Sequence, residues 1–213
     1  MFFLERSKAP VTSAIQVLIA VADGFEDMEV VISCDILRRA GLQVVLAGLE
    51  NGLVTGGRGL RLQPDALFAD VADADIDVIL LPGGIGGVER MAKHQPLIGL
   101  LQERTRQGQI IAAICAAPGM LAAHHLLDGR QVTAYPGTLD PQSRDYTYQE
   151  NAVVVDGPLI TSRGPGTAMD FALTLVELLL GPEKRQETEA PLHRSTPETS
   201  PLSATMDNRA SIT

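Results

Sequence analysis

The residue with the clearest chemical potential is Cys115. Residues 110–114 before it form a continuous apolar run, which is typical of a strand buried on both faces of a parallel sheet. After Pro118 the chain is rich in Ala and Leu, which favours a helix. A strand that turns sharply into a helix exposes its turn residue beside the free N–H groups of the helix start. Cys115 is therefore either a nucleophile at such a turn or, as most free cysteines are, a small buried hydrophobic residue.

Other polar groups follow the ends of predicted strands and could act on Cys115. A thiolate nucleophile needs a pKa lowered from about 8.5 towards neutrality, which amide donors at a helix start can provide. Glu29 would help if protonated, because a neutral carboxyl donates a hydrogen bond whereas an ionised one repels the thiolate. The N–H groups of Gly84 and Ala116 could form an oxyanion hole, and Tyr135 follows another strand end. The residues alone leave open that Glu29 is a helix-dipole acid and that Gly84 only serves a turn.

The sequence predicts no metal ion and no cofactor. The adjacent His124 and His125 would point to different sides of a helix, and the other histidines, His94 and His193, lack ligand spacing. Glycine clusters at 83–87 and 164–166 do not spell the dinucleotide-binding pattern, and no phosphate-binding loop is present. Cys34 lies among core positions of a predicted helix and is interpreted as structural.

The elements that must position these groups alternate along the chain. This alternation, without repeats, predicts an α/β doubly wound, mostly parallel sheet with helices on both faces. We expect one domain over residues 14–190, a leader over 1–13 and a polar, disordered tail over 191–213. The predicted strands are 15–21, 43–49, 77–81, 110–114 and 131–134, with a hairpin at 51–64 and either a hairpin or a bent strand at 153–161. The predicted helices are 28–40, 96–106 and 168–180.

Composition narrows the classes of partner and compartment. The formal charge of −9 argues against nucleic acid or an anionic membrane as the main partner. Two cysteines do not make a disulfide framework, which favours a reducing compartment. The four apolar residues at the start are too short for a signal peptide, and no apolar run could cross a bilayer. We therefore expect a soluble, cytoplasmic protein.

Five motifs, in order along the chain, resemble the ThiJ/PfpI superfamily, most closely the branch of the parkinsonism-associated protein deglycase and the bacterial chaperone YajL. The resemblance covers roughly residues 15–190. The motifs are Gly24-Phe-Glu-Asp-Met-Glu29, Asp35-Ile-Leu-Arg-Arg-Ala-Gly41, Leu81-Pro-Gly-Gly84, Ala112-Ala-Ile-Cys-Ala-Ala-Pro118 and Thr161-Ser-Arg-Gly-Pro-Gly-Thr167.

The resemblance implies a flavodoxin-like homodimer that works without a cofactor. By this resemblance Cys115 is a reactive, oxidation-prone cysteine, and Glu29 is its protonated hydrogen-bond partner. Backbone donors then come from Gly84 and Ala116. The family positions near the dimer interface and pocket are matched by Glu26, Arg39 and Arg58.

Two departures from the family pattern bear on the reaction. The protease-like branch has His directly after the cysteine, where this chain has Ala116, and the deglycase branch has His where this chain has Tyr135. Without an imidazole there is no Cys–His hydrolytic pair, and a phenol with a pKa near 10 is a poor base at neutral pH. The sequence therefore argues against peptidase activity, and aldehyde chemistry would rely on Cys115 and Glu29.

Three hypotheses about function remain open at this point, all centred on protection against oxidative stress. One is a cofactor-independent glyoxalase or protein deglycase, in which the Cys115 thiolate adds to methylglyoxal-type aldehydes or their protein adducts and Glu29 shuttles a proton. Another is a redox sensor in which Cys115 is oxidised to the sulfinic acid. The last is a chaperone that binds unfolded proteins without significant turnover.

Overall fold

The computed structural model describes residues 16–194 of the chain. The predicted leader and residues 195–213 of the predicted tail lie outside the described residues. The strands are β1 (Gln16–Val21), β2 (Gln43–Gly48), β3 (Val54–Thr55), β4 (Arg61–Leu62), β5 (Ala66–Leu67), β6 (Val78–Leu81), β7 (Ile110–Ile114), β8 (Gln131–Val132), β9 (Thr147–Tyr148), β10 (Val153–Asp156) and β11 (Leu159–Ser162). The helices are α1 (Asp27–Arg39), α2 (Phe68–Val71), α3 (Ile85–Lys93), α4 (Gln95–Gln107), α5 (Ala117–Ala123), α6 (Ala168–Leu180) and α7 (Pro182–Glu189), with 3₁₀ turns η1 (Pro165–Thr167) and η2 (Ala190–Leu192).

A seven-stranded sheet forms the centre of the molecule, with the order β10-β11-β7-β6-β1-β2-β5. All neighbouring pairs are parallel except β10 and β11, which form an antiparallel hairpin at one edge. The inner order β2-β1-β6-β7-β11 is the flavodoxin-like arrangement. The predicted fold class, a doubly wound and mostly parallel sheet, is therefore confirmed.

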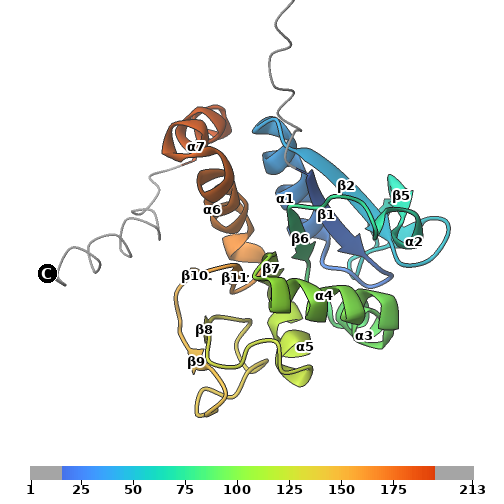
Figure 1. The fold of residues 1–213 in the computed structure, drawn as a ribbon. Helices are drawn as coiled ribbons and strands as arrows, with labels where there is room; N and C mark the ends of the chain where they lie inside the picture. The colour runs from blue at the N-terminus through green and yellow to red at the C-terminus, as the bar shows by residue number, and fades with distance from the viewer. Residues whose placement is uncertain (1–15, 195–213) are drawn as a thin grey trace, which may run out of the picture.

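Helices cover both faces of the sheet, as Figure 1 shows. Alternate residues of β1 point to opposite faces, so Val17, Ile19 and Val21 pack with α1 and α6, while Leu18 and Ala20 pack with α2, α3, α4 and α5. Both clusters are buried, which explains why the central strands read as continuous apolar runs.

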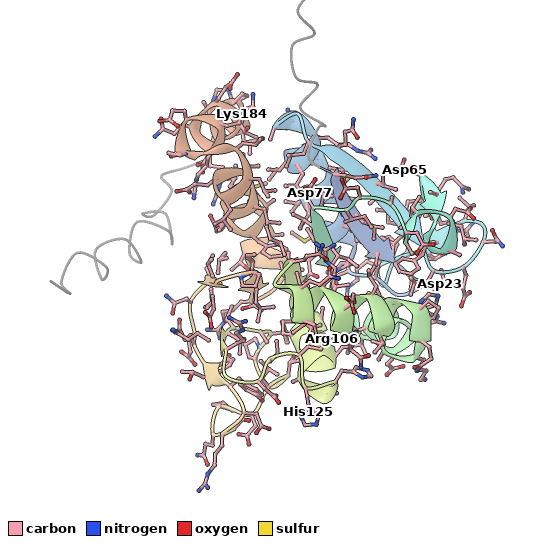
Figure 2. All side chains as sticks on the ribbon, in the orientation of Figure 1. Asp23, Asp65, Asp77, Arg106, His125 and Lys184 are labelled. Carbon is pink, nitrogen blue, oxygen red and sulfur yellow. The ribbon has the colours of Figure 1, made fainter. Side chains whose placement is uncertain are left out.

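The chain changes direction in the sheet between β1 and β6, since β2 lies beyond β1 and β7 lies beyond β6. In open α/β sheets such a switch point opens a crevice at the carboxyl ends of the strands. The hairpin β3–β4 folds over the loop after β1. Asp23, labelled in Figure 2, accepts a hydrogen bond from Thr55 N at 2.7 Å, and Asp27 accepts from Arg58 N and Leu60 N at 2.9 Å each.

Several segments differ from their sequence-based expectations. The helix α3 was not predicted, because its Gly86-Gly87 pair resembles a helix breaker; in the structure these glycines pack against the backbone of residues 23–25. The polar helix α7 was not predicted either. His124 and His125 follow the end of α5 rather than lying on a helix.

The described chain also continues beyond the expected domain boundary at residue 190. Leu192 packs against the core on the α6 side of the sheet. Arg194 pairs with Asp170 of α6 at 2.7 Å and with Glu189 of α7 at 3.1 Å. Leu192 and Arg194, within the first four residues of the predicted tail, therefore contact the domain.

Across residues 16–194 the structure contains no helix with the length and apolar character needed to cross a membrane.

Candidate active site

Cys115 occupies the turn between β7 and α5 with a backbone φ of 65°. Positive φ is uncommon for a residue with a side chain, and such strain persists only where neighbouring structure holds it. Here Cys115 N donates to Ser162 O and Tyr135 N donates to Cys115 O, both at 2.9 Å. The sharp strand–helix turn predicted from the sequence is therefore present, and Cys115 as a whole is only 9% exposed.

The side chain of Glu29 reaches the same place from the first turn of α1. It is fully buried, and its Oε2 accepts a hydrogen bond from Gly83 N at 2.6 Å. Its other oxygen, Oε1, is buried without a hydrogen-bond partner among the described residues. A buried polar atom without a hydrogen-bond partner costs free energy. Protonation of the carboxyl group or a hydrogen bond from a bound ligand would remove this cost at Oε1.

The approach of Glu29 to Cys115 depends on Gly83. A side-chain carbon placed on Gly83 would lie 2.6 Å from Cβ and 3.0 Å from Sγ of Cys115, and 2.8 Å from Oε2 of Glu29. The distances to Cys115 Cβ and Glu29 Oε2 are too short for a real carbon, and the distance to Sγ is tight. Because Gly83 has no side chain, the carboxyl group of Glu29 and the thiol of Cys115 can lie next to each other.

Gly84 has a different constraint, because its backbone lies directly on the loop after β1. Its φ is 88°, and a side-chain carbon there would overlap the carbonyl oxygen of Gly24 and lie 2.5 Å from Glu26 N. A hydrogen bond of 3.0 Å from Glu26 N to Gly83 O ties the two loops together. The loops at the switch point therefore meet backbone to backbone.

The acid and the thiol each change the other's ionisation. Burial is the largest cause that raises the pKa of Glu29 from its ordinary value of 4.5 to about 7, while the hydrogen bond from Gly83 N acts in the opposite direction. Burial, followed by the negative charge of Glu29, raises the pKa of the Cys115 thiol to about 12. A thiol that rests as a thiolate needs a lowered pKa, so the structure contradicts the expectation of a lowered pKa for Cys115. With the acid ionised, the thiol keeps its proton; protonation of Glu29 removes the repulsion.

The remaining predicted site residues surround the sulfur. The backbone N–H groups of Ala116 and Gly84 both hydrogen-bond to it and lower the pKa of Cys115, against the effect of burial. Tyr135 is 51% exposed and lies against Gly164: a side-chain carbon on Gly164 would be 3.2 Å from Tyr135 Cδ2 and 4.0 Å from Cys115 Sγ.

Sequence reasoning gave no role to three residues that the structure places at the site. They are Gly83, Ser162 and Gly164, all within quoted motifs. The doublet of glycines after a buried strand was the available signal for Gly83. The contacts of Ser162 and Gly164 link segments about 50 residues apart and leave no local pattern.

In the part of the chain that the structure describes, no group of three or more His, Cys, Asp or Glu residues could hold a metal ion. Cys34, the second cysteine, is buried inside α1 and packs in the core between α1 and the sheet.

These features define a class: a flavodoxin-like α/β protein with a buried cysteine–carboxyl pair at the switch point of its sheet. The model of the DJ-1/PfpI family matches residues 15–178, and the chain belongs to this family. The resemblance drawn from the motifs is therefore confirmed.

Known relatives support the same assignment over most of the chain. Protein dj-1beta of Drosophila melanogaster is 45% identical over 172 residues, which is 80% of this chain and 92% of the relative. The glutathione-independent glyoxalase DJR-1.2 of Caenorhabditis elegans is 40% identical over 168 residues, covering 78% of this chain and 89% of the relative. The crystal structure of Drosophila DJ-1beta superposes with a TM-score of 0.82 at 42% identity, covering 86% of this chain and all of that one.

Proposed function

We propose that this protein is a cofactor-independent glyoxalase that protects against small 2-oxoaldehydes of the methylglyoxal type. The observation that carries the proposal is the pair of Cys115 and Glu29, in which a buried acid with a pKa of about 7 and an unpaired Oε1 faces a thiol. A general base is most effective when its pKa is near the working pH. The name of the relative DJR-1.2, a glutathione-independent glyoxalase, supports the same reaction.

The raised pKa of the thiol suits a step in which the proton leaves as sulfur attacks. Ionised Glu29 takes the proton from Cys115 Sγ while sulfur bonds to the aldehyde carbon, and the carbonyl oxygen gains that proton to form a thiohemiacetal. Glu29 then moves a proton from the former aldehyde carbon to the neighbouring carbonyl carbon through an enediol, giving a thioester of the 2-hydroxy acid. Water releases the acid and restores the thiol. One aldehyde and one water become one 2-hydroxy acid, and no external oxidant or reductant is needed.

Backbone donors would stabilise the charge that develops in this sequence. The N–H groups of Gly84 and Ala116 already point at the sulfur, so an oxygen on the adjacent carbon lies within their reach. Tyr135, with its ring on Gly164, would bound the pocket on the solvent side and offer a phenol hydrogen bond. These roles extend to early protein adducts of the same aldehydes, which gives the deglycase form of the proposal.

A redox sensor and chaperone without significant turnover is the alternative. A protonated Glu29 would donate to the sulfinate of an oxidised Cys115, and the structure of Toxoplasma gondii DJ-1 is described as oxidized. Such a protein would protect unfolded clients in a Cys115-dependent way without consuming aldehyde.

We also propose a homodimer in a reducing, cytoplasmic setting. The exposed face of α1 carries Met28 and Val31, and the hairpin fastened to α1 by Asp27 exposes Leu53 and Leu60. Large apolar side chains grouped on one surface typically mark an interface. Light scattering at micromolar concentration that reports only a 22.7 kDa species would contradict the dimer.

The deciding experiment measures lactate release from methylglyoxal by the wild-type protein, Cys115→Ser and Glu29→Gln. We expect turnover in the wild type alone. Peroxide titration of Cys115, followed by intact mass, runs in parallel. Ready oxidation of Cys115 without any lactate from the wild type would favour the sensor and overturn the glyoxalase.

A further inference from the structure

The motif at residues 161–167 contains a pair of hydroxyl groups behind the reactive cysteine. Ser162 ends β11 and is fully buried, and its carbonyl accepts the N–H of Cys115. Its Oγ lies 2.7 Å from Oγ1 of Thr167 and 2.9 Å from the carbonyl oxygen of Ala152. The residue that fixes the backbone of Cys115 is thus joined by its side chain to the start of α6.

Thr167 closes a small loop around Gly164. Gly164 N donates to Thr167 Oγ1 at 3.1 Å, and Thr167 Oγ1 lies 2.9 Å from Gly164 O. Thr167 N also donates to Gly164 O at 2.9 Å. The hydroxyl of Thr167 therefore holds both the backbone N–H and the backbone carbonyl of Gly164.

The position of Gly164 matters for the thiol. Its backbone lies against the Tyr135 ring on one side and close to Cys115 Sγ, as the 3.2 Å and 4.0 Å distances from a side-chain carbon built there indicate. If this loop shifted outwards, water would reach the sulfur from the Tyr135 side. The loop is thus part of the wall that keeps the thiol dry.

We propose that Thr167, together with Ser162, is a positioning residue for Cys115: its hydroxyl holds the Gly164 loop and the Tyr135 ring against the sulfur and so sets the solvation of the thiol. The inference rests on the proposed function, because it concerns Cys115 as the reacting group. Thr167 acts through Gly164 and touches neither the thiol nor the substrate.

The expected consequence is electrostatic. Burial is the largest cause of the raised pKa of Cys115. The titratable groups that face the thiol are Glu29 of α1, with Glu26 behind it, and the exposed phenol of Tyr135. None of these contacts Thr167 by a hydrogen bond that the structure describes, so loss of the hydroxyl should act by letting in water and should lower the pKa of the thiol.

The test is the pH profile of Cys115 alkylation by iodoacetamide in the full-length protein, read by peptide mass mapping. In Thr167→Val we expect the profile to move down by about half a pH unit, equivalent to about threefold faster labelling at a fixed pH below the midpoint. Thr167→Ser keeps the hydroxyl and should restore the wild-type profile. Ser162→Ala should move the profile in the same direction, and the double variant should move it no further than Thr167→Val, because the two hydroxyls act through one contact.

Thr174→Val is the matched control. Thr174 lies in α6, the helix that follows Thr167, and is buried. Its Oγ1 has no hydrogen-bond partner among the described residues, so the change removes a hydroxyl without touching the Gly164 loop. An unmoved profile in Thr167→Val, or an equal shift in Thr174→Val, would overturn the inference. If Thr167→Val does not fold, the Ser162→Ala and Thr167→Ser profiles decide in the same way. Alkylation does not require aldehyde turnover, so a wild type that releases no lactate would refute the glyoxalase while leaving this result readable.

Discussion

The two buried cysteines of this chain lie in contrasting environments. Cys34 is 7% exposed inside a regular helix, and burial raises its pKa, followed by a lowering effect of Arg38. Cys115 is 9% exposed, at a strained turn, opposite an acid whose pKa is itself near 7. Nearly equal exposure thus accompanies very different chemistry. A facing proton acceptor and two amide donors, rather than access to solvent, distinguish the thiol that we propose to react.

Removing each sulfur in turn tests this contrast most directly. Cys115→Ser should lower methylglyoxal turnover by at least about 100-fold, because the alcohol is a far weaker nucleophile with a higher pKa. Cys34→Ser should keep turnover within about twofold, with only a modest loss of stability. The measurement is lactate release at pH 7 for both variants. Comparable losses in the two would mean that the strained turn confers no special reactivity.

Replacing Glu29 separates the function of the acid from its effect on stability. Its folded-state pKa is raised above the unfolded value, so its contribution to the free energy of unfolding is fully present below about pH 4.5 and is lost as the pH rises through 7. A shift from 4.5 to about 7 corresponds to about 3 kcal/mol. Glu29→Gln should therefore abolish turnover and yet be more stable than the wild type at pH 8, with the advantage vanishing near pH 4.5.

Urea unfolding at several pH values measures this difference. Glu26→Gln is the control, since Glu26 is only half-buried and has its charge at the same helix start. An equal gain in the two variants at pH 8 would assign the effect to general charge at the start of α1 instead of to the buried acid.

Filling the gap between the acid and the thiol should have a smaller effect on stability. A methyl group at Gly83 would lie 2.6 Å from Cys115 Cβ and 2.8 Å from Glu29 Oε2, so Gly83→Ala should lower the free energy of unfolding by about 2 kcal/mol through overpacking and impair turnover. Gly99→Ala is the matched control, because Gly99 lies in α4 with open space around it and Ala favours a helix. The midpoints of urea unfolding compare the two.

The rates of alkylation should show the smallest effect. We expect iodoacetamide to label Cys115 about tenfold faster than Cys34 at pH 7.5. Ionised Glu29 raises the pKa of the resting thiol, but it can take the thiol proton as the sulfur attacks, and this general-base effect outweighs the raised pKa. The Cys115 rate should also show an inflection near pH 7 that is absent for Cys34 and lost in Glu29→Gln. Peptide mass mapping after brief labelling gives both rates. Parallel profiles for the two thiols would remove Glu29 from the reaction.

Much of this architecture could be predicted from the sequence, because it is encoded locally. The apolar runs of the central strands and the helical spacing of α1, α4 and α6 match their structural bounds to within a residue or two. The helix α3 was missed because Gly86 and Gly87 serve a close approach between loops, which composition cannot distinguish from a break. The helix α7 was missed because its sequence is almost entirely polar; it is held by Arg185, which pairs with Glu177 and Glu189.

The candidate site was foreseeable as a set of residue types but not as an electrostatic arrangement. Family motifs pointed to Cys115 and Glu29. The hydrogen bond from Gly83 to Glu29 spans 54 positions in the chain, and the burial that raises both pKa values arises only from packing. For that reason the thiol was expected to ionise readily, whereas the structure favours a thiol that is deprotonated only as it reacts.

The backbone of Gly84 packs directly on the backbone of the loop after β1. This contact limits which mutations could change the substrate preference of the proposed enzyme. On that side of the sulfur the wall consists of peptide groups. A point substitution there has almost no side chain to replace, and a larger side chain would separate the two loops. The opposite side, where Tyr135 projects beyond Gly164, carries a replaceable side chain half open to solvent. Directed evolution towards bulkier aldehydes should therefore accumulate its changes at Tyr135 and its neighbours, while the glycine side stays unaltered.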